Sequence, residues 1–120
     1  MKLHRDEISS PEFWTDERCF ITECLNSEEV PEFSLAVARV KPSVTTQLHS
    51  LRDTKEIYII RKGTGLVLVG KKEVEVSIGD SVIIPANTPQ RITILSDSED
   101  LVFYCHCSPR FVPAANVIFE

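Results

Sequence analysis

Short apolar runs separated by turn residues are the sequence feature that most constrains the fold of this chain. Residues 73–78 alternate polar and apolar side chains with a period of two, which is typical of a β-strand with one wet face. Turn residues such as Gly63, Gly70 and Gly79 separate the runs. We interpret the following runs as strands: residues 19–25, 33–40, 44–51, 56–61, 66–69, 73–78, 81–84, 91–95 and 101–107. Many short strands without a long helical pattern predict an all-β sandwich or barrel.

The length of 120 residues predicts a single domain spanning residues 1–120. Residues 1–17 are expected to form an N-terminal arm. Within it, Ser10 and Pro11 precede residues 12–16 in the pattern of a capped helical turn, which we expect to close one end of the barrel. Residues 18–107 are expected to form the barrel. The tail, residues 108–120, is too apolar to extend into water, so we expect it to pack on the barrel or across a dimer.

Charge and composition exclude several classes of partner. The formal net charge is −5, and the basic residues are scattered, so neither nucleic acid nor an anionic membrane surface is an expected partner. No apolar run approaches the roughly 20 residues of a membrane span, and the first residues lack the apolar segment of a signal peptide. A cytoplasmic location is therefore expected, with the four cysteines as free thiols. Zinc binding by Cys105, His106 and Cys107 is disfavoured because successive strand residues face opposite sides.

Two stretches contain a more specific arrangement of residues than the alternation of a β-strand requires. They read His49-x-Leu51-x4-Glu56-x-Tyr58-x4-Gly63-x-Gly65 and Gly79-Asp80-x4-Pro85-x3-Pro89-Gln90. This pattern resembles the two motifs of the cupin superfamily, and the wider run over roughly residues 17–112 is similar to a bacterial subgroup of small single-domain cupins loosely labelled mannose-6-phosphate-isomerase-like. The resemblance implies a double-stranded β-helix, the jelly-roll barrel of cupins. It says little about reaction, because this scaffold hosts many activities.

The resemblance also implies a metal site. His49 and Glu56 match two of the family's metal ligands, Gln90 stands where the last histidine belongs, and Leu51 stands where the second histidine belongs. We therefore predict His49, Glu56 and Gln90 as ligands of a possible divalent ion, Zn²⁺, Mn²⁺, Fe²⁺ or Ni²⁺. The two replacements weaken the prediction, because leucine offers no donor and an amide oxygen is a weak one. The alternatives are a core histidine bonded to Glu56 and a Gln90 amide that ties down loop backbone.

Three further side chains are candidates for substrate binding. Tyr58 shares a strand face with Glu56, Arg39 follows apolar residues on one face of its strand, and His106 would replace a missing imidazole if it faced inward. Each has a simpler interpretation. Tyr58 packs at the cavity edge, Arg39 extends to solvent, and His106 faces away from the interior. The prediction of a site inside the barrel rests on Glu56, because a carboxylate inside an apolar barrel needs a partner, a metal or a proton.

Two functional hypotheses follow. The first is a small metal-dependent enzyme that acts on a polar small molecule, such as a sugar derivative or an organic acid. The second is a metal-free binding or regulatory module that holds a metabolite in the same cavity. A purely structural dimer is a third, weaker hypothesis, because an interior glutamate is costly to retain for packing alone. A homodimer is expected in each case, because exposed sheet edges need covering.

Overall fold

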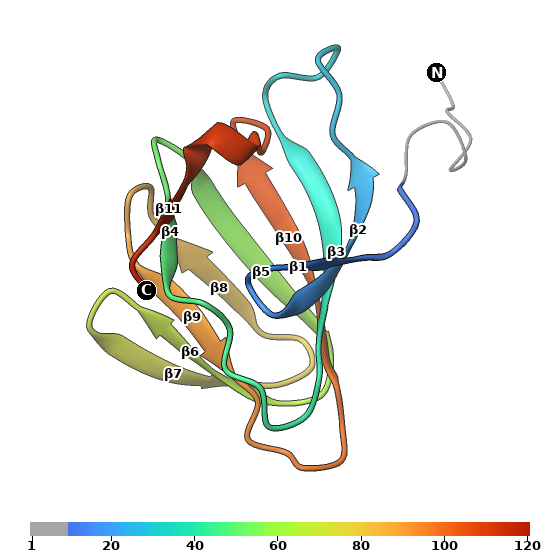
Figure 1. The fold of residues 1–120 in the computed structure, drawn as a ribbon, viewed down its shortest axis with the longest axis vertical. Coiled ribbons are helices and arrows are strands. Elements are labelled where there is room, and N and C mark those ends of the chain that lie inside the picture. Colours follow the sequence, from blue (N-terminus) through green and yellow to red (C-terminus); the bar gives the residue numbers. More distant parts are fainter. Residues whose placement is uncertain (1–9) are drawn as a thin grey trace.

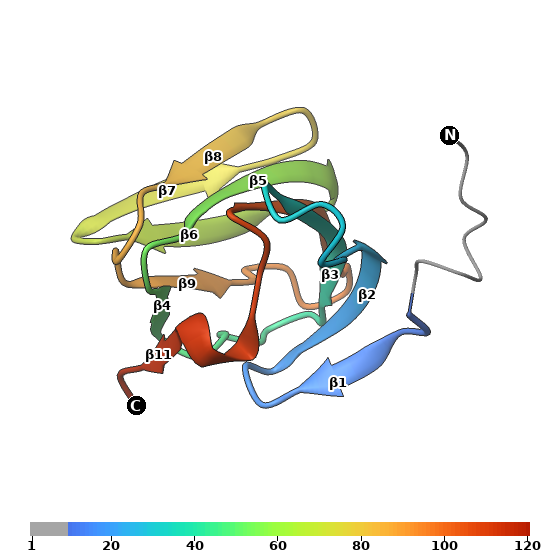
Figure 2. The ribbon, with the colours of Figure 1, turned by 90° about the horizontal axis from the view of Figure 1, so that it is seen from above.

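Two antiparallel β-sheets stacked face to face form the molecule. The computed structural model describes residues 10–120, with one sheet in the order β1-β2-β3-β10-β5-β8 and the other in the order β11-β4-β9-β6-β7. Figure 1 and Figure 2 show the sheets curving toward each other as a barrel. The strands are β1 Phe13–Thr15, β2 Cys19–Leu25, β3 Ser34–Val40, β4 His49–Leu51, β5 Lys55–Lys62, β6 Gly65–Val69, β7 Lys72–Val76, β8 Ser81–Ile84, β9 Gln90–Thr93, β10 Leu101–Ser108 and β11 Asn116–Ile118. The predicted all-β jelly roll is confirmed.

The core lies between the sheets because alternate residues of each strand point inward. In β5, Glu56, Tyr58 and Ile60 are buried, whereas Ile59 is exposed. Val67 of β6, on the facing sheet, is fully buried. Burying an aliphatic side chain of this kind contributes roughly 1.5–3 kcal/mol. The same alternation that builds the core therefore also places a carboxylate and a phenol inside it.

The central strands hold the barrel together. β10 pairs with β3 on one side and with β5 on the other, and its register shifts between Val102 and Phe103 at a bulge. Near this bulge, Gly63 follows β5 with a φ of 82°, a left-handed conformation that favours glycine. The chain crosses there from one sheet to the other, since β6 begins at Gly65.

The first predicted element is wrong. The helical turn expected over residues 12–16 is instead β1, in which Phe13 pairs with Ile21 and Trp14 pairs with Phe20. The ring of Trp14 packs edge-on against that of Phe20, with centroids 5.0 Å apart. Cross-strand aromatic contacts of this kind stabilise strands, and here they outweigh the capping signal of Ser10 and Pro11. As a result, a hairpin, not a helix, forms one edge of the six-stranded sheet.

The remaining strand predictions differ from the structure mainly at their ends. Of residues 44–51, only His49–Leu51 forms a strand, because the backbone before it bonds several different segments: Thr46 N donates to Ile92 O, and Gln47 N donates to Glu17 O. The tail packs on the barrel, where β11 follows a short 3-10 helix, η1 Pro113–Ala115, and pairs with β4. Across residues 10–120, no helix is long and apolar enough to span a membrane.

Candidate functional site

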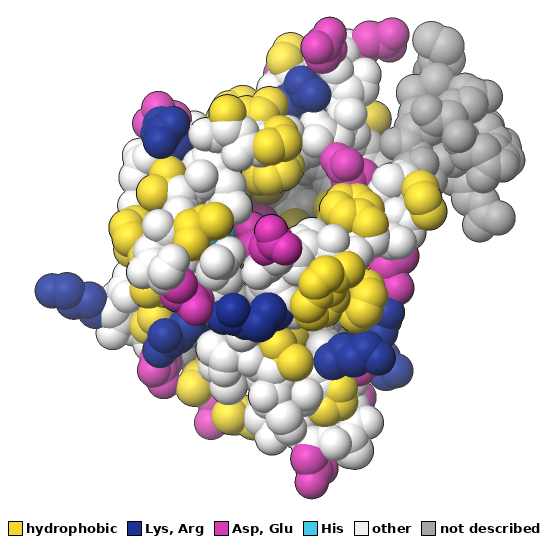
Figure 3. Space-filling model, in the orientation of Figure 1, with side chains coloured by type: hydrophobic (Ala, Val, Ile, Leu, Met, Phe, Trp, Pro, Cys, Tyr) yellow, Lys and Arg dark blue, Asp and Glu magenta, His cyan; other side chains and the backbone are white. Residues whose placement is uncertain are grey.

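A cavity of about 150 Å³ opens between the sheets at the end covered by the β1–β2 hairpin. Figure 3 shows a hollow on this face, with acidic and hydrophobic side chains at its rim. Most of the lining side chains are apolar. The residues that line it are Phe13, Thr15, Glu17, Cys19, Ile21, Glu23, Asn26, Ser34, Leu35, Ala36, Ala38, Val40, Thr46, His49, Leu51, Glu56, Tyr58, Ile92, Phe103, Cys105, Cys107 and Phe111.

Glu56 is a buried carboxylate in the cavity wall with one unpaired oxygen. It projects inward from β5, is only 8% exposed, and accepts a weak hydrogen bond from Cys107 Sγ at 3.6 Å through Oε2. Its other carboxylate oxygen, Oε1, is buried without a hydrogen-bond partner. Burial raises the pKa of Glu56, and the nearby Gln90 amide and His49 imidazole only partly offset this effect. A buried acceptor left unpaired costs roughly 1–3 kcal/mol, so the fold retains an incompletely satisfied group here.

Tyr58 and Gln90 form a bonded pair beside Glu56. The Tyr58 hydroxyl donates to Gln90 Oε1, and the Tyr58 ring packs against Phe103 with centroids 4.7 Å apart. Gln90 is 1% exposed at the start of β9, where it pairs in register with His49 of β4. Burial raises the pKa of Tyr58 well above its usual value. The phenol therefore acts as a neutral hydrogen-bond donor whose partner is already fixed.

His49 connects the cavity to the β1–β2 turn. It is buried, with Nδ1 2.9 Å from the Gln47 carbonyl oxygen and Nε2 3.8 Å from a carboxylate oxygen of Glu17. The other Glu17 oxygen accepts a hydrogen bond from Asn116 Nδ2 at 3.2 Å. Arg18, the next residue, pairs with Glu120 at 3.1 Å, which fastens the turn to the chain end. Glu17 was not predicted as a site residue, because nothing in the sequence of a turn indicates which distant strand it will cover.

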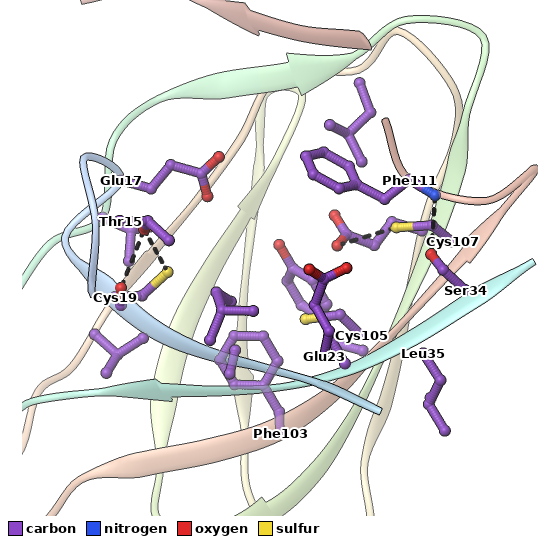
Figure 4. A pocket seen from close by; sticks show the side chains of 18 of the residues that line it. Thr15, Glu17, Cys19, Glu23, Ser34, Leu35, Phe103, Cys105, Cys107 and Phe111 are labelled. Atoms are coloured by element: carbon purple, nitrogen blue, oxygen red, sulfur yellow. Dashed lines mark hydrogen bonds between the residues drawn. The ribbon is translucent and has the colours of Figure 1, made fainter. Parts of the chain in front are cut away.

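Glu23 is a second carboxylate that the sequence did not reveal. In Figure 4, Glu17 from the turn and Glu23 from β2 both reach toward the cavity, from different sides. Glu23 Oε2 accepts a hydrogen bond from Asn26 Nδ2 at 2.8 Å. The alternation of β2 is a usable signal here, since Cys19, Ile21 and Glu23 share one face. The carboxylates of Glu17, Glu23 and Glu56 thus line one cavity.

The cysteines are free thiols in the structure. Cys19, Cys105 and Cys107 line the cavity, while Cys24 does not. Burial raises the pKa of Cys19 to about 11 and raises that of Cys107 further. These thiols therefore stay protonated near neutral pH, and their reactivity is low. They act as small apolar side chains in the wall.

Arg39 and His106 lie outside the cavity, so the inner placement predicted for Arg39 is wrong. Arg39 pairs with Glu12 at 2.7 Å and with Asp100 at 3.2 Å on the outer face of β3, because Ala38 and Val40 are the residues whose parity points inward. His106 stacks on Phe33 with ring centroids 5.1 Å apart, while its neighbours Cys105 and Cys107 face the cavity. The outward orientation of His106 is the alternative that the strand pattern favoured.

Comparison with known families decides the class of this fold. A family model for the cupin domain matches residues 36–107, more than half of the chain. The chain is a cupin. Among curated proteins, this cupin is 34% identical over 76 residues to an uncharacterized protein of Methanocaldococcus jannaschii, a match that covers 63% of this chain and 61% of the relative. The chain therefore aligns with less than two thirds of that relative's length.

Solved structures share the fold of this cupin at low sequence identity. The nucleoside dehydratase Pac13 of Streptomyces is 15% identical with a TM-score of 0.80, and the match covers 100% of this chain and 91% of Pac13. KdgF from Halomonas sp. is 15% identical with a TM-score of 0.74, covering 85% and 88% of the two chains. The cupin domain of Schizosaccharomyces pombe Cnp3 is 13% identical with a TM-score of 0.70, covering 82% and 69%. At these identities, the likeness shows the fold alone.

The donors in this cupin do not fit a transition-metal site. His49, Glu56 and Gln90 all lie around the same buried region, but the oxygen of Gln90 already accepts from Tyr58. Leu51 lines the cavity at the position where a second imidazole would be needed. Within residues 10–120, no three His, Cys, Asp or Glu side chains are grouped so as to hold a metal ion. Of the three predicted ligands, one imidazole and one carboxylate remain, which leaves a divalent transition ion short of the usual three protein ligands.

Proposed function

We propose that this cupin binds a small molecule in the cavity and does so without a metal ion. The observation that carries the proposal is the Oε1 oxygen of Glu56, which is buried and unpaired in a cavity large enough for a ligand. A ligand that donates a hydrogen bond to this oxygen would remove the cost of leaving it unpaired. The fold of the nucleoside dehydratase Pac13 supports a small-molecule site in a barrel of this shape.

A variant that fills the cavity tests this proposal. Ala36 lines the cavity from β3, so Ala36→Leu is expected to place extra methyl groups in the space that a ligand would use. Small fragments that shift the amide NMR signals of cavity residues in the wild type should fail to do so in Ala36→Leu. The matched control is Ala86→Leu, an exposed position outside the cavity lining. Fragment binding that persists in Ala36→Leu, or a screen with no binder at the cavity, would contradict the proposal.

A metal-dependent enzyme acting on a small polar molecule is the second candidate. It is favoured by one observation, namely that His49 and Glu56 both line the same cavity. The two candidates differ in metal content, which elemental analysis of the purified protein measures.

A homodimer and a cytoplasmic location belong to the same proposal. Ile59 and Ile83, which are 39% and 63% exposed, lie on the outer face of the six-stranded sheet and supply apolar surface for a second copy. Four free thiols are the state expected in a reducing compartment. A solution mass equal to that of one 13.6 kDa chain would contradict the dimer.

A further inference from the structure

The charged groups around the cavity are almost all negative. Among residues 10–120, three carboxylates line it, and the lining includes no Lys or Arg side chain. Arg39 is tied to Glu12 and Asp100 on the outer face of β3, and Arg18 is tied to Glu120 and the Thr45 carbonyl. Among the described lining residues, His49 is the one basic side chain, and it lies against Glu17. The cavity therefore repels anions and attracts cations.

A second feature also favours a cationic ligand, namely the unpaired oxygen of Glu56. Glu56 is 8% exposed and lines the cavity, and its Oε1 has no hydrogen-bond partner in the described structure. An ammonium group carries three N–H donors and no acceptor, so it matches an unpaired carboxylate oxygen. Hydrogen bonds between two charged partners are also stronger than those between neutral groups.

Other polar side chains of the lining already form hydrogen bonds with backbone groups, which disfavours a sugar as the ligand. Ser34 Oγ accepts from Phe111 N, Thr46 Oγ1 accepts from Ile92 N, and Thr15 Oγ1 donates to the Cys19 carbonyl. A sugar needs several hydrogen-bond partners around its ring, whereas most of this lining is apolar. Figure 4 shows the rings of Phe103 and Phe111 in the wall. An apolar or aromatic group fits such walls, and aromatic faces also attract cations.

We propose that the ligand of this cavity is a small organic cation, an amine attached to a compact apolar group, and this proposal rests on the proposed function. The ammonium pairs with the carboxylates of Glu56 and Glu23, and the apolar group lies against the aromatic and aliphatic walls. An apolar cavity of about 150 Å³ takes a molecule the size of benzene. The lining thus favours an amine over the sugar derivative or organic acid expected from the sequence.

Three aromatic probes of similar size and different charge test this inference: benzylamine, benzyl alcohol and benzoate. Each is titrated into the full chain while the amide NMR signals of cavity residues such as Ala38 and Phe103 are followed. We expect benzylamine to bind at least about tenfold more tightly than benzyl alcohol, because a charge-assisted bond replaces a neutral one. Benzoate is expected not to bind, since it would meet the three carboxylates.

Variants assign the preference to named groups. Glu56→Gln and Glu23→Gln should each lower the preference for benzylamine over benzyl alcohol, whereas Glu73→Gln, an exposed position on β7, should leave it unchanged. Thermal melts establish that each variant is folded, and Glu23 supplies a second test if Glu56→Gln does not fold. Equal or tighter binding of benzyl alcohol or benzoate would overturn the amine inference while sparing the proposed small-molecule site. Absence of benzylamine shifts at cavity amides would also overturn it, and the proposed site would then be decided by the fragment screen on Ala36→Leu.

Discussion

Gly63→Ala is expected to destabilise the protein by about 3–5 kcal/mol, a large part of the 5–15 kcal/mol typical of a domain. Gly63 adopts a φ of 82°, and a Cβ at this position would lie 2.3 Å from the Asp100 carbonyl oxygen. That oxygen belongs to backbone next to the start of β10, so it cannot move aside as a side chain tip does. Urea unfolding followed by circular dichroism measures the loss.

Gly79→Ala is the matched control for the close backbone contact. Gly79 has a φ of 93°, yet nothing lies within 4 Å of a Cβ built there. Its substitution should therefore cost only the strain of the left-handed backbone, roughly 1–2 kcal/mol. Similar losses in the two variants would show that the approach of Asp100 to Gly63 contributes little to stability.

Glu56→Gln is expected to stabilise the protein increasingly as the pH rises. Burial raises the pKa of Glu56 in the folded state, so the folded protein binds this proton more tightly than the unfolded chain. The contribution of Glu56 to stability is therefore complete below the unfolded-state pKa and is lost as the pH rises through the folded-state pKa. A glutamine side chain stays neutral and avoids this loss. We expect a gain of roughly 1–3 kcal/mol at about pH 8 and little gain at about pH 4, by analogy with the cost of an unpaired buried group.

The measurement is urea unfolding of wild type and variant at both pH values. His49, Glu17 and Cys107 also interact with Glu56, but the difference between the two proteins at each pH isolates the carboxylate. Glu73→Gln, with an exposed side chain on β7, is the control and should change little at either pH. A stability difference between wild type and Glu56→Gln that does not depend on pH would contradict a proton-linked carboxylate.

The sequence predicted those features that depend on alternation within one strand. The parity of β5 placed Glu56 and Tyr58 on one face, and both line the cavity. The same argument separates Cys105 and Cys107 from His106, which faces outward. The prediction for Arg39 was wrong because it took the apolar residues on the same face as Arg39 to point inward. In the structure, Ala38 and Val40 are the residues of this part of β3 that face the cavity.

Features that depend on contacts between distant segments were not predictable in this way. Glu17 reaches His49 only because the β1–β2 turn lies over β4, and the local signal at Ser10 and Pro11 indicated a helix there instead. The bond between Tyr58 and Gln90 joins two strands from different sheets. No local sequence preference predicts a bond of this kind. This bond nevertheless decides whether the Gln90 oxygen remains free for a metal.

Elemental analysis of protein purified without a histidine tag tests whether the cavity binds a metal ion. The protein is incubated with excess Mn²⁺, Fe²⁺, Zn²⁺ and Ni²⁺ in turn and then freed of unbound ions by gel filtration, and His49→Ala is treated in parallel. Because the predicted ligands are one imidazole, one carboxylate and an amide already bonded to Tyr58, we expect far less than one ion per chain in either protein. One ion per chain in the wild type, lost in His49→Ala, would contradict this account.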